Sequence, residues 1–162
     1  DTNDVLPAIT YWLMGSLSFS TSSIVWNLTI PMLGGILILI FFSKYLNALS
    51  LGDEEAKALG INTKLIKLII IIVATLISAL SVILAGIIGW IGLIIPHITR
   101  LIFGADNKVI LPMSALIGAI FLLLVDNVSK LIFSFEIPIG IVTAIIGIPI
   151  FIFVLKNDKK GF

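Results

Sequence analysis

The sequence predicts an all-α, polytopic membrane protein with about five transmembrane helices, one of them short, and a further short helix in a cytoplasmic loop. Two properties of the composition carry this prediction: 59% of the 162 residues are hydrophobic and only 12% are charged. The third observation is that long stretches contain no Asp, Glu, Lys or Arg. A soluble domain of this size could not bury so much apolar surface, so a lipid bilayer is the natural solvent.

The stretches free of charge are Ser23–Phe42, Leu68–Thr99, Val109–Val125 and Ile137–Leu155. A spanning helix needs about 20 mainly apolar residues, so the first, third and fourth stretches each accommodate one span. The second stretch is too long for one span, because as a single helix it would measure about 48 Å against a hydrocarbon core of about 30 Å.

The second stretch is therefore predicted to fold as a hairpin. Gly86, Gly89 and Gly92 at its middle permit backbone conformations that other residues avoid, and Trp90 is typical of membrane interfaces. The return helix, about 20 Å long, cannot cross a bilayer alone and must lie among other helices. The predicted elements are an outer loop at 1–23 with a short helix around Tyr11–Leu17, a polar loop at 47–63, and spans at 24–45, 65–86, 91–103, 110–133 and 138–155.

The basic residues predict the orientation of these five spans. With the 47–63 loop in the cytoplasm, alternation of the spans places nine of the ten basic residues on that side. They are Lys44, Lys57, Lys64, Lys67, Arg100, Lys108, Lys156, Lys159 and Lys160. This follows the positive-inside rule and predicts a cell-membrane protein whose first residue lies outside and whose last residue lies in the cytoplasm.

The 47–63 loop is the most polar part of the chain and predicts one short amphipathic helix. Ser50 is positioned to cap it, and the acidic run Asp53, Glu54, Glu55 suits a helix N-terminus. Ala56, Ala58 and Leu59 form a small apolar face, Lys57 lies on the polar side, and Gly60 is a natural C-cap. Two interpretations stay open: a solvated connector, or a docking helix for a cytoplasmic partner.

The only His and the only Arg lie together in the short return helix. Pro96, His97 and Arg100 fall near its inner end, and His97 and Arg100 share a helix face at a spacing of i and i+3. Two interpretations stay open. The three residues form a contact point at the inner surface, or Arg100 is a charge that sets the membrane topology and His97 has its hydrogen bonds satisfied at the helix end.

Three charged residues lie near the outer turn that joins the last two spans. Asp126 and Lys130, at i and i+4, can pair one turn apart. Self-neutralisation at the interface is one interpretation of the pair. Glu136 precedes Pro138 in the outer turn and is interpreted as a loop charge in water.

Several classes of function find no support in the composition. The net charge of +1 gives no basic field for nucleic acid, and the absence of cysteine excludes thiolate metal sites. A single His and the lack of a Gly-rich phosphate loop predict no catalytic constellation, no metal site and no cofactor. The first residues show no signal-peptide pattern and resemble the middle of a protein, from which we expect a fragment or a C-terminal half.

Five strings, in order along the chain, resemble the permease family of ABC importers for iron-siderophore, haem and cobalamin. They are WLMGSLS, LSLGDEEAKALGIN, AGIIGWIGLIIPHITRLIFGADNK, ILPMSALIGA and EIPIGIVTAIIGIPIFIFVLK, and they are spread along nearly the whole chain, from residue 12 to residue 156. Within the second string, Glu54, Ala56 and Gly60 match the motif by which such permeases contact their ATPase, with Glu55 at a position that is usually small.

The resemblance implies the C-terminal half of a permease with ten membrane helices that works as a homodimer. It further implies a separate cytoplasmic ATP-binding cassette subunit, an extracytoplasmic substrate-binding protein and an iron(III)-siderophore, haem or cobalamin-type substrate. The 47–63 loop would couple to the ATPase, Pro96, His97 and Arg100 would form a second inner contact, and Lys130, with Glu136, would face the binding protein.

This chain departs from the family's pattern at two places. Asp106 is followed by Asn107 and Lys108 where a His–Arg pair is common, and Lys130 stands where the family has Arg, which loses the planar bidentate fork. The alternative functions are a half-length secondary transporter or a structural membrane subunit. A secondary transporter would need ionisable groups at membrane depth, and the charge-free spans argue against these.

Overall fold

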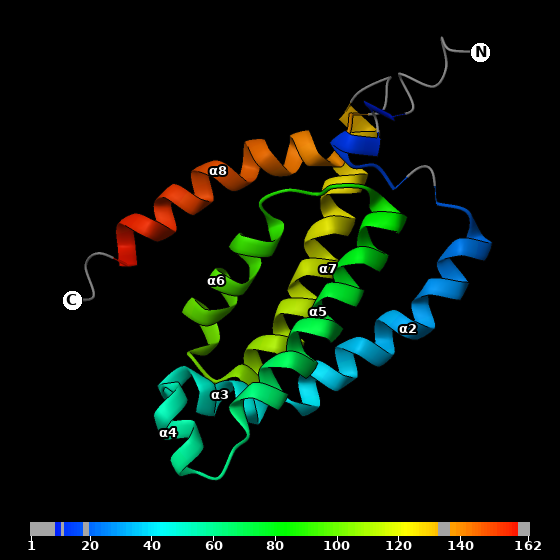
Figure 1. Ribbon diagram of the computed structural model, residues 1–162. Coiled ribbons are helices and arrows are strands. Elements are labelled where there is room, and N and C mark those ends of the chain that lie inside the picture. Colours follow the sequence, from blue (N-terminus) through cyan, green and yellow to red (C-terminus); the bar gives the residue numbers. More distant parts are fainter. Residues whose placement is uncertain (1–8, 11, 18–19, 133–136, 159–162) are drawn as a thin grey trace.

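The computed structural model describes residues 9–10, 12–17, 20–132 and 137–158. Every regular element in these ranges is a helix, which confirms the predicted all-α class (Figure 1). The helices are α2 (Ser22–Phe41), α3 (Ser43–Leu51), α4 (Asp53–Ala58), α5 (Thr63–Ala85), α6 (Ile91–Phe103), α7 (Asn107–Ile132) and α8 (Ile139–Asp158).

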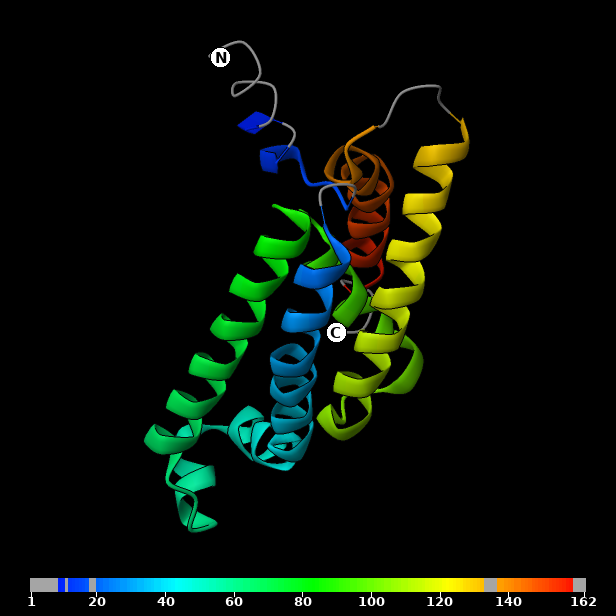
Figure 2. The same cartoon turned by 90° about the vertical axis from the view of Figure 1, so that its right-hand side faces the viewer.

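Within the described residues, three helices are long and apolar enough to cross a membrane: Ser22–Phe41, Thr63–Ala85 and Asn107–Leu131. Two shorter apolar helices, Ile91–Phe103 and Ile139–Ile152, accompany them. Helix α2 packs on α5, and α6 packs on α7 (Figure 2). Large apolar side chains such as Trp26, Ile30 and Leu131 point away from this bundle, as expected for a chain whose surroundings are lipid or other helices.

The hairpin between α5 and α6 turns on two unusual backbone conformations. Gly86 ends α5 at a φ of 66°, and Trp90 has a φ of 67° just before α6. The Ile91 N–H donates to the Gly89 carbonyl over 2.8 Å, which closes a γ-turn around Trp90. Gly147 of α8 leaves room for the Trp90 side chain, whose ring lies 6.0 Å from that of Phe151. This tight turn separates α5 from α6, which has 13 residues.

The predicted first span, 24–45, and the predicted single helix of the 47–63 loop need correction. Helix α2 ends at Phe41, and α3 starts at Ser43 as a separate helix that enters the loop. Gly52, with a φ of 128°, separates α3 from α4. Gly52 is also the N-cap of α4, whereas the Ser50 hydroxyl donates to the Asn47 carbonyl over 2.7 Å, so the prediction that Ser50 caps the helix was wrong.

Three segments meet at the end of the bundle opposite α3 and α4, near the start of α8 (Figure 1). The Ser16 N–H donates to the Ala85 carbonyl over 3.0 Å, and the Ile139 N–H donates to the Gly15 carbonyl over 2.9 Å. The segments approach so closely, backbone to backbone, that a Cβ atom on Gly140 would overlap the Met14 carbonyl oxygen. We call the contact around Gly15, Gly86 and Gly140 the glycine junction.

Candidate functional site

Helix α4 projects from the α3–α4 end of the bundle and carries most of the predicted site residues (Figure 1). Asp53, Glu54 and Glu55 occupy its first turn and Lys57 its last turn, which complements the helix dipole. The Lys57 ammonium lies 2.7 Å from the Glu54 carboxylate. The Lys67 ammonium of α5 lies 2.6 Å from the Asp53 carboxylate, and this exposed pair ties α4 to α5 only weakly.

The two apolar residues predicted to share the contact face of α4 point in different directions. Ala56 is 0% exposed and packs inside the chain, whereas Leu59 is 66% exposed. Two hydrogen bonds fix the turn after the helix. The Gly60 N–H donates to the Lys57 carbonyl at 2.8 Å, and the Ile61 N–H donates to the Ala56 carbonyl at 3.1 Å. With Gly60 at a φ of 78°, this is the Schellman motif expected of a C-terminal glycine.

Helix α6 ends on the same side of the molecule as α3 and α4 (Figure 1). Pro96 and Arg100 are exposed and His97 is half-buried, while Thr99 between them is fully buried and donates to the Ile95 carbonyl over 2.8 Å. Among the described residues, no hydrogen bond or ion pair engages the side chain of His97 or Arg100. The guanidinium therefore has its donors available.

A polar cluster that sequence reasoning missed joins α3 to the start of α7. The Asn47 amide donates to the Asp106 carboxylate over 2.6 Å, and its carbonyl oxygen accepts from the Asn107 backbone and side-chain N–H groups, each over 2.8 Å. The Asp106 carboxylate also accepts from the Lys108 N–H over 2.9 Å. The bond from Asn47, and then that from Lys108, hold the pKa of Asp106 below its usual value, so this side chain stays ionised at neutral pH.

The charged pair predicted at the far end of α7 is present. The Lys130 ammonium lies 2.7 Å from the Asp126 carboxylate, and Lys130 is the more exposed partner. Between them in the sequence, the buried Ser129 donates to the Ile137 carbonyl over 2.7 Å and closes the connection to α8. Glu136 lies outside the described residues.

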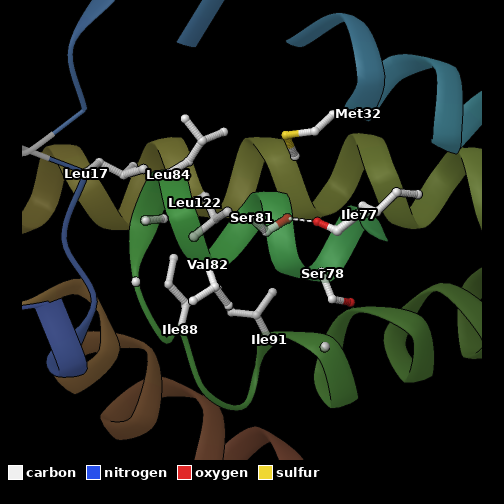
Figure 3. A pocket seen from close by; sticks show the side chains of 13 residues that line it. Leu17, Met32, Ile77, Ser78, Ser81, Val82, Leu84, Ile88, Ile91 and Leu122 are labelled. Carbon is white, nitrogen blue, oxygen red and sulfur yellow. Dashed lines mark hydrogen bonds between the residues drawn. The ribbon is translucent and has the colours of Figure 1, made fainter. Parts of the chain in front are cut away.

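An apolar cavity of about 530 Å³ lies between α2, α5, α6 and α7 (Figure 3). Met32, Ile77, Ile91 and Leu122 are among the side chains that line it. The Ser81 hydroxyl at its wall donates to the Ile77 carbonyl over 2.9 Å. Among the residues that the structure describes, no group of His, Asp and Glu could hold a metal ion.

Comparison with known proteins decides the family. A sequence profile of the FecCD transport family matches residues 2–157, nearly the whole chain. The chain belongs to the FecCD transport family. The resemblance read from the five strings is thereby confirmed, as is the polytopic ABC-permease fold.

Relatives in the FecCD family have different substrates in their names. The molybdate import system permease protein MolB of Haemophilus influenzae is 42% identical over 99% of this chain and 48% of its own length. The cobalamin import system permease protein BtuC of Halobacterium salinarum is 38% identical over 96% of this chain and 42% of its own length. The iron(3+)-hydroxamate import system permease protein FhuB of Bacillus subtilis is 36% identical over 98% of this chain and 41% of its own length.

A solved structure shows the same arrangement of helices. An inward-facing conformation of a metal-chelate type ABC transporter superposes with a TM-score of 0.86 at 42% identity, covering 97% of this chain and 51% of that chain. The chain thus spans about half the length of the FecCD proteins it matches.

Proposed function

We propose that this chain is the C-terminal half of the membrane permease of an ATP-driven importer. It forms one side of the translocation pathway, and a separate ATP-binding cassette subunit hydrolyses ATP. The observation that carries the proposal is the shared end of α4 and α6, where an exposed, charged helix and the unpaired Arg100 face away from the bundle in a chain of the FecCD family.

The ATP-binding subunit docks on two elements of this end. The carboxylates of Glu54 and Glu55 and the ammonium of Lys57 provide polar contacts on α4, and Leu59 provides the exposed apolar contact. Pro96, His97 and Arg100 form the second contact, at the end of α6. Gly60 shapes the turn that ends α4, and Asp53 adds a weak link to Lys67 of α5.

The orientation follows from the distribution of basic residues. Lys44, Lys57, Lys67, Arg100 and Lys108 lie on or beside α3, α4 and the adjoining ends of α5, α6 and α7. Under the positive-inside rule this end lies in the cytoplasm of a multi-pass cell-membrane protein. The N-terminal residues then lie outside and residue 162 inside.

The opposite end meets the extracytoplasmic substrate-binding protein. Lys130 is the exposed cation there and faces a carboxylate of that protein, with Glu136 nearby in the sequence. A second copy of the permease completes the pathway as a homodimer, and lipid covers the outward apolar faces.

The proposed substrate is an iron(III)-siderophore, haem or cobalamin-type chelate. Relatives named for hydroxamate-bound iron and for cobalamin support a bulky chelate, while MolB adds the smaller molybdate anion as a competing candidate. The chain itself contributes an apolar cavity and no metal-binding cluster among its described residues, which suits a substrate that arrives already complexed.

The proposal is tested by uptake into proteoliposomes that hold the permease containing this chain, its ATP-binding subunit and its binding protein. The probes are ⁵⁵Fe(III)-hydroxamate, ⁵⁷Co-cobalamin and ⁹⁹Mo-molybdate. We expect uptake of a chelate that requires ATP inside the vesicle and stops when the ATP-binding subunit is omitted. Uptake driven by a proton or sodium gradient without ATP would contradict the proposal and favour the secondary transporter, and uptake of molybdate alone would contradict the chelate.

A further inference from the structure

Asn47 caps α7 from a different helix. The first backbone N–H groups of a helix have no partner within the helix and must be satisfied by other groups. Here the Asn47 side chain accepts from the Asn107 N–H, while Asp106 accepts from the Lys108 N–H. Because Asn47 also donates to Asp106, one side chain of α3 holds the first residue of α7 and the residue before it. We call Asn47, Asp106 and Asn107 the α3–α7 clasp.

The clasp is one of two polar connections that the described residues make between the α3–α4 unit and the long helices, and its side chains are the shorter ones. The other connection, between Asp53 and Lys67, joins two half-exposed side chains and runs through the flexible stem of a lysine. The clasp instead uses short Asn and Asp side chains, which have few rotamers, and α3 also packs directly against α7. We therefore expect that even a small displacement of α3 moves the start of α7.

We propose that Asn47 is a positioning residue that transmits the movement of the α3–α4 unit to α7 when the ATP-binding subunit changes state. The inference rests on the proposed function, because it needs a partner that moves α4. Helix α4 contacts both α3 and α5, so a push on α4 reaches the bundle by two routes, and the route through α3 includes the clasp. Helix α7 spans the bundle and carries the Asp126–Lys130 pair at its far end, so the clasp connects both ends of the molecule.

A reciprocal exchange of Asn and Asp tests the clasp. Asn47→Asp places a second carboxylate against Asp106 and removes the donor between them, so the clasp opens. Asp106→Asn leaves an acceptor for both existing donors and is expected to be mild. The double variant N47D/D106N restores the clasp with donor and acceptor exchanged between the two positions. Asn47→Ala opens the clasp without adding charge and serves as a second opening variant.

The readout is the amount of substrate moved per ATP hydrolysed, using the probe of the three above that the wild-type assembly imports. Measured on the purified, assembled complex, this ratio does not depend on how much protein folds, so a purely structural cap would leave it unchanged. We expect Asn47→Asp and Asn47→Ala to lower the ratio about fivefold and the double variant to recover most of it. Asn127→Ala is the matched control and should match wild type, because it makes the same change on α7 outside the clasp, where the side chain donates only to the Leu123 carbonyl of its own helix.

An unchanged ratio in both opening variants would overturn the role of Asn47, and so would a double variant as uncoupled as Asn47→Asp. Failure of the proposed function gives a different result, because the wild-type assembly itself would then show no ATP-dependent uptake of any probe.

Discussion

Replacing Gly140 by alanine is expected to lower the yield and the thermal unfolding midpoint of the protein. The added Cβ atom would overlap the Met14 carbonyl oxygen, and a backbone atom cannot move aside as a flexible side chain can. Separating the segments would break the bond from the Ile139 N–H to the Gly15 carbonyl and open the glycine junction. Overpacking of this kind costs about 1–3 kcal/mol or more, a large part of the stability of a small domain.

The measurement is the yield of monodisperse permease in detergent together with its thermal unfolding midpoint. Gly34→Ala is the matched control, because a Cβ on Gly34 of α2 meets nothing within 4 Å. Alanine has the higher helix propensity, so this control should be as stable as wild type or more stable. Equal yield and midpoint for Gly140→Ala and wild type would show that the three segments do not pack as described.

Ala56→Leu is expected to uncouple transport from ATP hydrolysis. Ala56 has no exposed surface, so a leucine there must displace α4 from α3 and α5 and move its charged face away from the docking position. We expect ATP-dependent uptake to fall at least about tenfold while the ATP-binding subunit remains able to hydrolyse ATP, because a misplaced contact is costly even far from the chemistry.

Two comparisons isolate the effect of burial at position 56. Ala79→Leu makes the same change on an exposed surface of α5, away from α4, and should leave uptake near the wild-type level. Glu54→Ala breaks an exposed ion pair with Lys57 and removes a proposed docking contact, so it should lower uptake with little effect on stability. Wild-type uptake in Ala56→Leu would mean that the position of α4 does not control transport.

The order and approximate bounds of the long helices follow from the sequence, because they depend on local properties of the chain. Charge-free length identifies the long helices, and the glycines around Trp90 predict the break between α5 and α6; α6 runs from Ile91 to Phe103, the bounds predicted for the return helix. The family resemblance depends on contiguous strings and is likewise visible without coordinates.

Features that depend on contacts between distant residues could not be predicted. Asn47 and Asp106 are 59 residues apart, and neither has a neighbour in sequence that marks it as half of a clasp. Nothing in the sequence around Gly140 indicates that its neighbour in space is the carbonyl of Met14. The sequence predicts that Ala56 and Leu59 share one apolar face. Only the packing of α4 shows that Ala56 is buried and Leu59 is exposed.

Cysteine crosslinking tests the docking of the ATP-binding subunit most directly. The chain has no native cysteine, so Lys57→Cys, Arg100→Cys and Lys130→Cys each add its only thiol. In native membranes containing the whole transporter, we predict that positions 57 and 100 both crosslink to one ATP-binding subunit and that position 130, at the opposite end, does not. Crosslinks to that subunit from position 130 alone, or from none of the three in an intact transporter, would contradict the account.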